Sequence, residues 1–424
     1  MDQSATDGPV LGTRALLRIR DFRLLWLAQV ISDFGDSLTN LALLIFVNQV
    51  TGSTAAIATM AIVLGVPQVT FGLLAGVYVD RLDRRRIMRG ADGLRGLLVL
   101  GFVAASLTQQ LPLLYLIGFV QASIGAFFTP ARGALLPALV PRGGLMAANG
   151  LSQMSRIIAG VAGTAAAGLL VGALGTFWPA FLIDALTFFV SVALVGCIRA
   201  RVATPVSTGR GTPRAIFTQL GEGLQTIGRS RILLGTLLAL AITMLGLGAV
   251  NVLVVPLILN DLRVPATWFG AVELAQAASM VLSGSLVAVL AARLAPARIV
   301  SVGLLLIGAL TALIGLSGSI WHLLVILFAV GWVMTPLQAA IATIMQTGVE
   351  DRLRGRIGAA LSTVVSSASL LSMALAGGFG EWVGPRNVFL LAGGVTVLAA
   401  ILAAAMLGAR RAAAPAAAAE AVLT

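Results

Sequence analysis

The first long apolar stretch of the chain carries a row of polar residues whose types and spacing suit proton chemistry. The row consists of Gln29, Asp33, Asp36 and Asn40. Its members are four, three and four positions apart, which places them on one face of an α-helix. Two carboxylates one helical turn apart repel each other, so one of them gains affinity for a proton. A proton held there can be exchanged for a cationic or polar ligand.

The composition indicates where such a helix lies. Of the 424 residues, 58% are hydrophobic and only 10% are charged, and the mean hydropathy is +1.01. A soluble domain carries roughly 25% charged residues, so an ordinary soluble enzyme and a disordered scaffold are excluded. The net charge of +12 comes from 28 basic residues, all of them arginine. They lie between apolar runs, which is typical of a membrane protein and excludes nucleic acid as a partner.

Several kinds of chemistry are excluded by residues that the chain lacks. The single cysteine, Cys197, and the single histidine, His322, cannot form a disulfide framework or a metal site built from these residue types. The sequence has no Gly-x4-Gly-Lys-Ser/Thr loop for ATP. We therefore predict that the protein is not an enzyme and uses no catalytic residue, metal or cofactor.

Twelve apolar windows have the length of about 20 residues that a helix needs to cross a hydrocarbon layer of about 30 Å. We predict spans at 24–50, 55–79, 88–107, 113–138, 149–173, 178–199, 232–258, 267–292, 297–317, 321–345, 357–379 and 387–408. Counted from Leu24, Asp33 lies ~14 Å and Asp36 ~18 Å into the first span. A carboxylate at that depth in lipid costs about 2.5–3.5 kcal/mol, so the polar row is expected to face a water-filled cavity. The alternative is that Asp36 braces neighbouring helices without binding a proton.

The arginines predict the orientation of the chain. If the N-terminus is cytoplasmic, 23 of the 28 basic residues fall in inner segments, and two, Arg263 and Arg386, fall in outer loops. Cytoplasmic loops are rich in basic residues, so both termini are expected in the cytoplasm.

The longest polar stretch between spans separates two halves. Within it, a helical spacing of apolar residues indicates a short amphipathic helix on the inner membrane face; these residues are Ile216, Leu220, Leu224 and Ile227. We predict a first bundle at 1–200, a cytoplasmic linker at 201–231, and a second bundle with a short tail at 232–424.

The two halves resemble each other. Gly125-Ala-Phe-Phe-Thr-Pro130 corresponds to Gly331-Trp-Val-Met-Thr-Pro336 at an offset of 206, and a second match lies at an offset of 212. Similar offsets at equivalent positions indicate an internal repeat of six spans. The predicted fold class is therefore an all-α integral membrane protein with twelve transmembrane helices in two pseudo-symmetric six-helix bundles.

The loop between the second and third spans reads Gly76-Val-Tyr-Val-Asp80-Arg81-Leu-Asp83-Arg84-Arg85-Arg86. It resembles the signature loop of the major facilitator superfamily, Gly-x-x-x-Asp-Arg/Lys-x-Gly-Arg/Lys-Arg/Lys, with Asp83 in place of the second glycine. Other stretches, including Phe22-Arg-Leu-Leu-Trp26 and Phe181-Leu-Ile-Asp-Ala185, are similar to the drug:proton antiporter branch that contains macrolide efflux pumps and the enterobactin exporter. The resemblance covers essentially the whole chain and implies alternating access between two bundles.

The resemblance also implies that the signature loop is a conformational latch, which holds the inside closed in the outward-facing state. Its residues are Gly76, Asp80, Arg81, Arg84 and Arg85. Physically, a glycine permits close helix packing, and a carboxylate can face the positive end of the span that begins near Ile357. The alternative for the arginines is that they only set the topology and contact lipid phosphates.

Two features depart from the antiporter pattern and weaken the expectation of proton antiport. Related antiporters often carry an arginine in the fourth span, where this chain has Gly118. The span-five signature Gly-x8-Gly-x3-Gly-Pro-x2-Gly-Gly has lost its proline and survives as Gly150, Ala159, Gly163, Thr164, Ala167 and Gly168.

The remaining charged residues inside spans are interpreted by position. Arg156, ~10 Å into the fifth span, either reaches Asp33 or snorkels to the inner surface, and both remain open. Asp92 and Arg95, three positions apart, are expected to form a structural pair. Glu273 is expected to line an outer vestibule.

Polar residues elsewhere in the spans carry weaker signals. Asp184 is interpreted as a hydrogen-bond acceptor between helices. The candidate cavity-lining residues are Gln121, Asn251, Thr335 and Gln338.

We therefore predict a monomeric secondary exporter in the cytoplasmic membrane of a prokaryote, which expels an amphipathic drug or natural product in exchange for protons. Its expected partners are this small-molecule substrate, protons and membrane lipids. Two alternatives remain open: a siderophore exporter, and a lysophospholipid flippase or facilitator without obligate proton antiport. The departures in spans four and five favour the lipid alternative slightly, whereas the paired acids of the first span oppose it.

Overall fold

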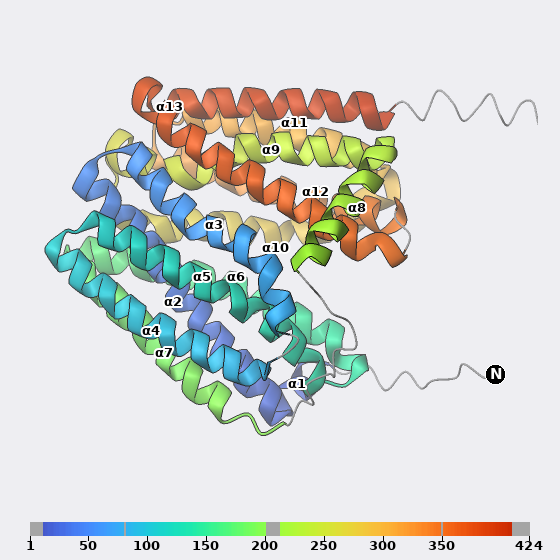
Figure 1. Ribbon diagram of the computed structural model, residues 1–424. Helices are drawn as coiled ribbons and strands as arrows, with labels where there is room; N and C mark the ends of the chain where they lie inside the picture. The colour runs from blue at the N-terminus through green and yellow to red at the C-terminus, as the bar shows by residue number, and fades with distance from the viewer. Residues whose placement is uncertain (1–11, 80–81, 201–212, 349–350, 409–424) are drawn as a thin grey trace, which may run out of the picture. The chain divides into compact units, whose positions relative to one another are not determined.

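A computed structural model describes residues 12–79, 82–200, 213–348 and 351–408, and within these ranges the chain is helical without any strand (Figure 1). The earlier helices are α1 (Thr13–Arg18), α2 (Arg20–Thr51), α3 (Thr54–Val79), α4 (Arg84–Thr108), α5 (Leu111–Leu139), α6 (Leu145–Leu174) and α7 (Trp178–Gly196). The later ones are α8 (Pro213–Arg229), α9 (Arg231–Pro256), α10 (Phe269–Arg293), α11 (Pro296–Gly315), α12 (Ile320–Gly348) and α13 (Asp351–Gly408). Short helical turns are η1 (Arg142–Gly144), η2 (Leu257–Asp261) and η3 (Ala266–Trp268).

These helices account for the predicted spans. Eleven helical stretches in the described ranges are long and apolar enough to cross a bilayer. The longest of them, α13, is interrupted at Gly384, where φ is 79° and ψ is 155°. This left-handed conformation suits glycine, and Pro385 follows it, so the helix breaks there. The two arms of α13 therefore correspond to the last two of the twelve predicted spans.

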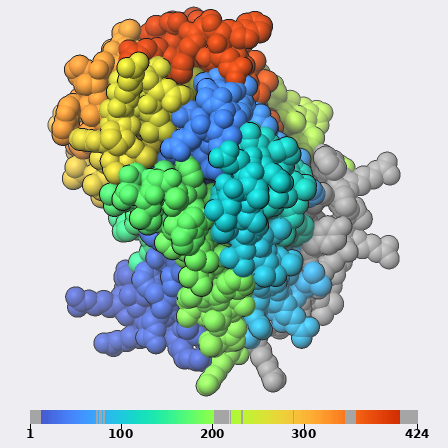
Figure 2. Space-filling model, turned by 90° about the vertical axis from the view of Figure 1, so that its left-hand side faces the viewer, coloured from blue at the N-terminus to red at the C-terminus, as the bar shows by residue number. Residues whose placement is uncertain are grey.

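Large apolar side chains are exposed along the outer surfaces of the helices. On α4 and α7, which pack against each other, Leu97 is 60% exposed and Leu186 is 55% exposed. Figure 2 shows these two helices side by side, α7 in green and α4 in blue to cyan. A soluble protein rarely exposes so much apolar surface, whereas a bilayer solvates it and leaves the backbone bonds inside the helices.

The described residues pack as two compact units. The first contains residues 12–51, 63–79, 82–200, 213 and 265–273, and the second contains 52–62, 214–264, 274–348 and 351–408. In the first unit α2 packs against α6 and α7, and α4 packs against α5 and α7. In the second unit α13 packs against α9 and α11, and α11 packs against α12. Each unit has its own cluster of buried apolar side chains.

The small residues of the span-five signature lie where α6 meets α2. Ala159, Gly163 and Ala167 recur every four positions and are all buried. A Cβ on Gly163 would collide with the backbone oxygen of Phe34 and approach the Cβ of Ser37 to 2.9 Å. The lost proline is therefore not needed for close packing here, because the small-residue face itself lets the two helices touch.

The amphipathic helix expected in the linker is present as α8, but part of its apolar face is covered by protein. Ile227 is 1% exposed and clusters with Leu233 of α9 and Ile357 of α13. Leu220 packs against the same cluster, whereas Leu224 remains 44% exposed. The spacing predicted the helix, but it could not tell burial against other helices from burial in the membrane face.

Gly35 of α2 permits the closest approach between α2 and α7. A Cβ at this position would overlap the carboxylate of Asp184 and the hydroxyl of Thr187. Asp184 is fully buried, so its carboxylate has no solvent-filled space into which to retreat. The absence of a side chain at position 35 thus brings a buried acid next to the polar row of α2.

We predict that Gly35→Ala destabilises the protein by about 1–3 kcal/mol, the usual cost of overpacking a filled site. Thermal unfolding of the purified protein in a neutral detergent measures this loss. Gly133→Ala on α5 is the matched control, because a Cβ there meets nothing within 4 Å. Equal melting temperatures for the two variants would contradict the packing described for α2 and α7.

Candidate functional site

A cavity of about 310 Å³ opens among α2, α3, α4, α5 and α6 of the first unit. Its volume lies at the lower end of the range that small-molecule sites occupy. All four members of the polar row on α2 line it: Gln29, Asp33, Asp36 and Asn40. The other polar lining residues are Ser32, Thr39, Gln68, Arg95, Gln121, Thr129, Arg132 and Arg156.

An ion pair between Asp36 and Arg95 forms one wall of this cavity. The Nη2 atom of Arg95 donates to the Oδ1 atom of Asp36 at 2.5 Å. The side chain of Arg95 is 11% exposed and that of Asp36 is 31% exposed. Because the guanidinium of Arg95 has little access to water, it depends on Asp36 for stabilisation, whereas Asp36 also faces the cavity.

Three further groups fix the position of Arg95. Its Cζ atom lies 4.3 Å from the centre of the Phe188 ring, a cation–π contact. Its Nη1 atom lies 3.9 Å from Oδ1 of Asp92. A Cβ on Gly125 of α5 would lie 3.4 Å from the guanidinium. Where related antiporters carry an arginine in the fourth span, α5 has Gly118. The guanidinium of Arg95 from α4 lies against α5 at Gly125.

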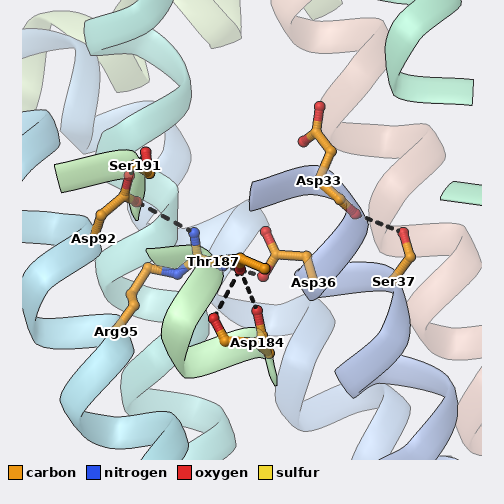
Figure 3. A network of polar contacts seen from close by, with 8 residues as sticks. All are labelled: Asp33, Asp36, Ser37, Asp92, Arg95, Asp184, Thr187 and Ser191. Atoms are coloured by element: carbon orange, nitrogen blue, oxygen red, sulfur yellow. Dashed lines mark hydrogen bonds and ion pairs between the residues drawn. The ribbon is translucent and has the colours of Figure 1, made fainter. Parts of the chain in front are cut away.

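Two fully buried carboxylates belong to the same network (Figure 3). Asp92 accepts a hydrogen bond from Ser191 at 2.5 Å. Asp184 accepts one from Thr187 at 3.2 Å. In the described part of the chain, one oxygen of each carboxylate is buried without a hydrogen-bond partner. Asp184 therefore lies beside the polar row, where α7 packs on α2, and takes part in the acidic network.

Asp33 is set apart from this network. Its carboxylate points away from Arg95 in Figure 3 and forms no hydrogen bond with the described residues, while its backbone oxygen accepts one from Ser37 at 2.9 Å. The charges of Arg132 and Arg156 are near enough to attract it. Among the described residues, however, no basic group lies within the 4.0 Å of an ion pair with Asp33.

Arg156 was predicted either to reach Asp33 or to extend to the inner membrane surface, and the structure matches neither alternative in full. It lines the cavity and is exposed, but it forms no ion pair with Asp33 in the described part of the chain. The preceding residue, Ser155, accepts a hydrogen bond from the indole nitrogen of Trp26 at 2.9 Å. This bond joins α6 to α2 directly beside the cavity.

The other predicted cavity residues divide between the units. Gln121 lines the cavity of the first unit. Glu273 belongs to the first unit but does not line that cavity. Thr335 lies in the second unit and donates to the backbone oxygen of Met280 at 2.9 Å. Asn251 and Gln338 also belong to the second unit, where both are exposed.

The signature loop is described only in part. Asp80 and Arg81 lie outside the described residues, and of Gly76 only its place in α3 is described. Asp83, which replaces the glycine of the family pattern, is the N-cap of α4 and accepts from the backbone nitrogens of Arg85 and Arg86. Arg85 donates to the backbone oxygen of Ala200 at 3.4 Å, and Arg84 is half-buried. The substitution at position 83 thus stabilises the start of α4.

Sequence reasoning missed two contributions to this site. Asp92 and Arg95 lie within ion-pair distance at 3.9 Å, as their spacing of three positions predicts, but the shorter contact of Arg95, with Asp36 on another helix, does not follow from the sequence. Arg132 was not selected at all, although it follows Gln121 by eleven positions and therefore shares its face of α5. That periodicity was a usable signal for Arg132, whereas no local pattern indicates the pairing of Arg95.

The twelve-span plan and the polar cavity define a membrane transporter of the major facilitator superfamily. The family model described as transmembrane secretion effector matches residues 11–422, and the chain belongs to that family. It is a multi-pass membrane transporter and not an enzyme, as predicted. The resemblance to the major facilitator superfamily and its efflux branch is confirmed.

Relatives and solved structures agree with this assignment. The chain is 24% identical over 393 residues to macrolide efflux protein A of Streptococcus pyogenes, covering 90% of this chain and 94% of the relative. It is 27% identical over 385 residues to the multidrug efflux pump Tap of Mycobacterium tuberculosis, covering 87% and 88%.

Two solved structures share the fold. A point mutant of the nucleoside transporter NupG has a TM-score of 0.77 at 11% identity, covering 91% of this chain and 99% of that one. A bacterial homologue of the iron transporter ferroportin, in an inward-facing state, has a TM-score of 0.74 at 14% identity, covering 92% and 99%. The all-α membrane fold of the major facilitator type is confirmed.

We predict that Asp36 and Arg95 are energetically coupled. Arg95→Gln leaves Asp36 and Asp92 without their cation, and Asp36→Asn deprives Arg95 of its shortest ionic contact, so each single change lowers stability. The double variant is expected to lose less than the sum of the two, with a coupling of about 1–3 kcal/mol. Thermal unfolding in detergent measures all four proteins. Strictly additive losses would show that the pair contributes nothing to stability.

Proposed function

We propose that the protein exports an amphipathic small molecule from the cytoplasm in exchange for protons. Its similarity to macrolide efflux protein A and to the pump Tap supports export of drugs or natural products. The polar cavity of the first unit supports a ligand that combines polar and apolar parts. Exchange for protons is supported mainly by one observation: Arg95 lies between two carboxylates, Asp36 at 2.5 Å and Asp92 at 3.9 Å.

In this proposal a proton decides which carboxylate holds Arg95. When Asp36 binds a proton, it loses its charge and most of its attraction for the guanidinium. Arg95 then moves toward Asp92, which is already on its other side. When Asp36 releases the proton, the original ion pair re-forms. Proton binding therefore changes the shape and charge of the cavity wall that the cargo contacts.

The charge balance of the network suits this role. Asp36, Asp92 and Asp184 carry three negative charges if all are ionised, and Arg95 supplies one positive charge within an ion-pair distance. Unbalanced charge in a buried site is costly, and a proton on one of the acids reduces the cost. Cargo that alters the surroundings of Asp36 thus alters its proton affinity. Competition between proton and cargo for one site is what antiport requires.

We predict that Asp36→Asn reduces proton-driven transport at least tenfold, because an amide cannot exchange the proton. The measurement uses proteoliposomes with an imposed pH gradient and two probes, the macrolide erythromycin and the acidic amphipath fusidic acid. Wild-type transport should stop when an uncoupler collapses the gradient.

Asp261→Asn is the matched control for this variant. Asp261 also pairs with an arginine, Arg386 at 3.5 Å, but it lies in the second unit and does not line the cavity. It should transport as the wild type does. Full proton-driven transport by Asp36→Asn would refute the role proposed for Asp36. Wild-type transport that ignores the uncoupler would favour a facilitator without proton antiport.

We also propose that both termini are cytoplasmic, from the arginine bias of the loops. The only cysteine of the chain, Cys197, directly follows α7 and is exposed. With a cytoplasmic N-terminus, the inner end of α7 places this thiol on the cytoplasmic side.

We predict that a membrane-impermeant maleimide labels Cys197 only after cells are permeabilised. As a control, Cys197→Ser combined with Gln110→Cys moves the thiol to an exposed position between α4 and α5, on the opposite side. This variant should be labelled in intact cells. The reverse labelling pattern would show that the orientation is inverted.

A further inference from the structure

Two arginines that line the cavity take no part in the proposed proton mechanism. Arg132 comes from α5 and Arg156 from α6, and both line the cavity that contains Asp36. In the described part of the chain, neither guanidinium lies within 4.0 Å of a carboxylate, and neither forms a side-chain hydrogen bond within the protein. The two positive charges are near enough to repel each other.

The charges around the cavity do not cancel. Its ionisable lining residues are Asp33, Asp36, Arg95, Arg132 and Arg156. Asp36 pairs with Arg95, and Asp33 opposes two arginines, so these lining residues by themselves carry one excess positive charge. The fully buried Asp92 and Asp184 do not line the cavity and are not part of this count. A net cation inside a membrane span is costly and calls for a partner. An anionic group of a bound molecule would supply that partner.

Guanidinium groups are well suited to this task. Arginine presents a planar fork of donors that matches the geometry of a carboxylate or a phosphate, and it stays charged at any physiological pH. Gln68 and Gln121 add amide donors to the lining of the cavity, and Leu43, Leu64 and Phe128 add apolar surface. The wall therefore combines an anion-binding end with contacts for a hydrocarbon part.

We propose that Arg132 and Arg156 bind the anionic group of the cargo, so that the transported class is an amphipath with a carboxylate or a phosphate. This inference rests on the proposed function and narrows its substrate class, since a purely cationic drug would meet like charge in the cavity. The acidic group has two sources, a soluble amphipathic acid or the phosphate of a single-chain lipid. Both arginines attract the carboxylate of Asp33. A bound anion would take the place of this carboxylate as the group that the two arginines attract.

The test measures binding of matched amphipaths to the purified protein in a neutral detergent at fixed pH, by isothermal titration calorimetry. The probes are laurate, lysophosphatidylglycerol and dodecyltrimethylammonium. We expect the two anions to bind and the cation to bind at least tenfold more weakly. Tighter binding of laurate would assign a soluble acid, and tighter binding of lysophosphatidylglycerol would assign a lipid phosphate.

Variants locate the site. Arg132→Gln and Arg156→Gln should each weaken binding of the preferred anion at least tenfold, and Arg132→Lys should retain more affinity than Arg132→Gln. Arg14→Gln makes the same change in charge on α1, away from the cavity, and should bind as the wild type does. Far-ultraviolet circular dichroism checks that each variant is folded.

The outcome separates this inference from the proton mechanism. Loss of proton-driven transport in Asp36→Asn reports on Asp36, whereas anion binding by Arg132→Gln and Arg156→Gln, measured at fixed pH without a gradient, reports on the two arginines alone. Equal or tighter binding of dodecyltrimethylammonium, or anion binding that is unchanged in folded Arg132→Gln and Arg156→Gln, would overturn the assignment.

Discussion

The ion pair between Asp36 and Arg95 is the interaction on which the rest of the first unit depends. Both charges lie inside an apolar helix bundle, where neither is stable without the other. The surrounding contacts hold the guanidinium between two carboxylates, Asp36 and Asp92, and against the ring of Phe188. An arginine held in this way has two discrete partners available to it. A proton bound to Asp36 therefore changes which of the two carboxylates the guanidinium contacts.

The packing of the helices serves this arrangement. Gly35 lets α7 approach α2 closely enough to bring Asp184 beside the polar row, and Gly163 does the same for α6. Gly125 of α5 lies against the guanidinium of Arg95, where a Cβ would make an ordinary contact at 3.4 Å. Small residues in membrane helices are commonly explained by helix association alone. Here Gly35 also decides that a buried acid, Asp184, can lie beside the polar row of α2.

Much of the fold could be predicted from the sequence, because each span must be a long apolar helix and the spacing of Asp33 and Asp36 fixes one helix face. The sequence also predicts a break between the last two spans, where α13 is interrupted at Gly384, and the spacing of apolar residues predicts the amphipathic helix α8. The partner of Arg95 could not be predicted, since spacing within one helix favours Asp92, whereas the contact with Asp36 depends on how α2 and α4 pack. Arg132 was not selected for a different reason: only the structure shows that its face of α5 lines the cavity.

In the proposed mechanism, Asp36 takes up and releases a proton while Arg95 changes partner. Infrared difference spectroscopy of the purified protein tests it most directly, by following the carbonyl stretch of a protonated carboxylic acid as the pH is lowered. Other carboxylates also take up protons as the pH falls, so we expect one component of this band, present in the wild type and in Asp33→Asn, to be missing from the spectrum of Asp36→Asn. A band that persists unchanged in Asp36→Asn would show that another acid carries the proton, and the mechanism built on this ion pair would be wrong.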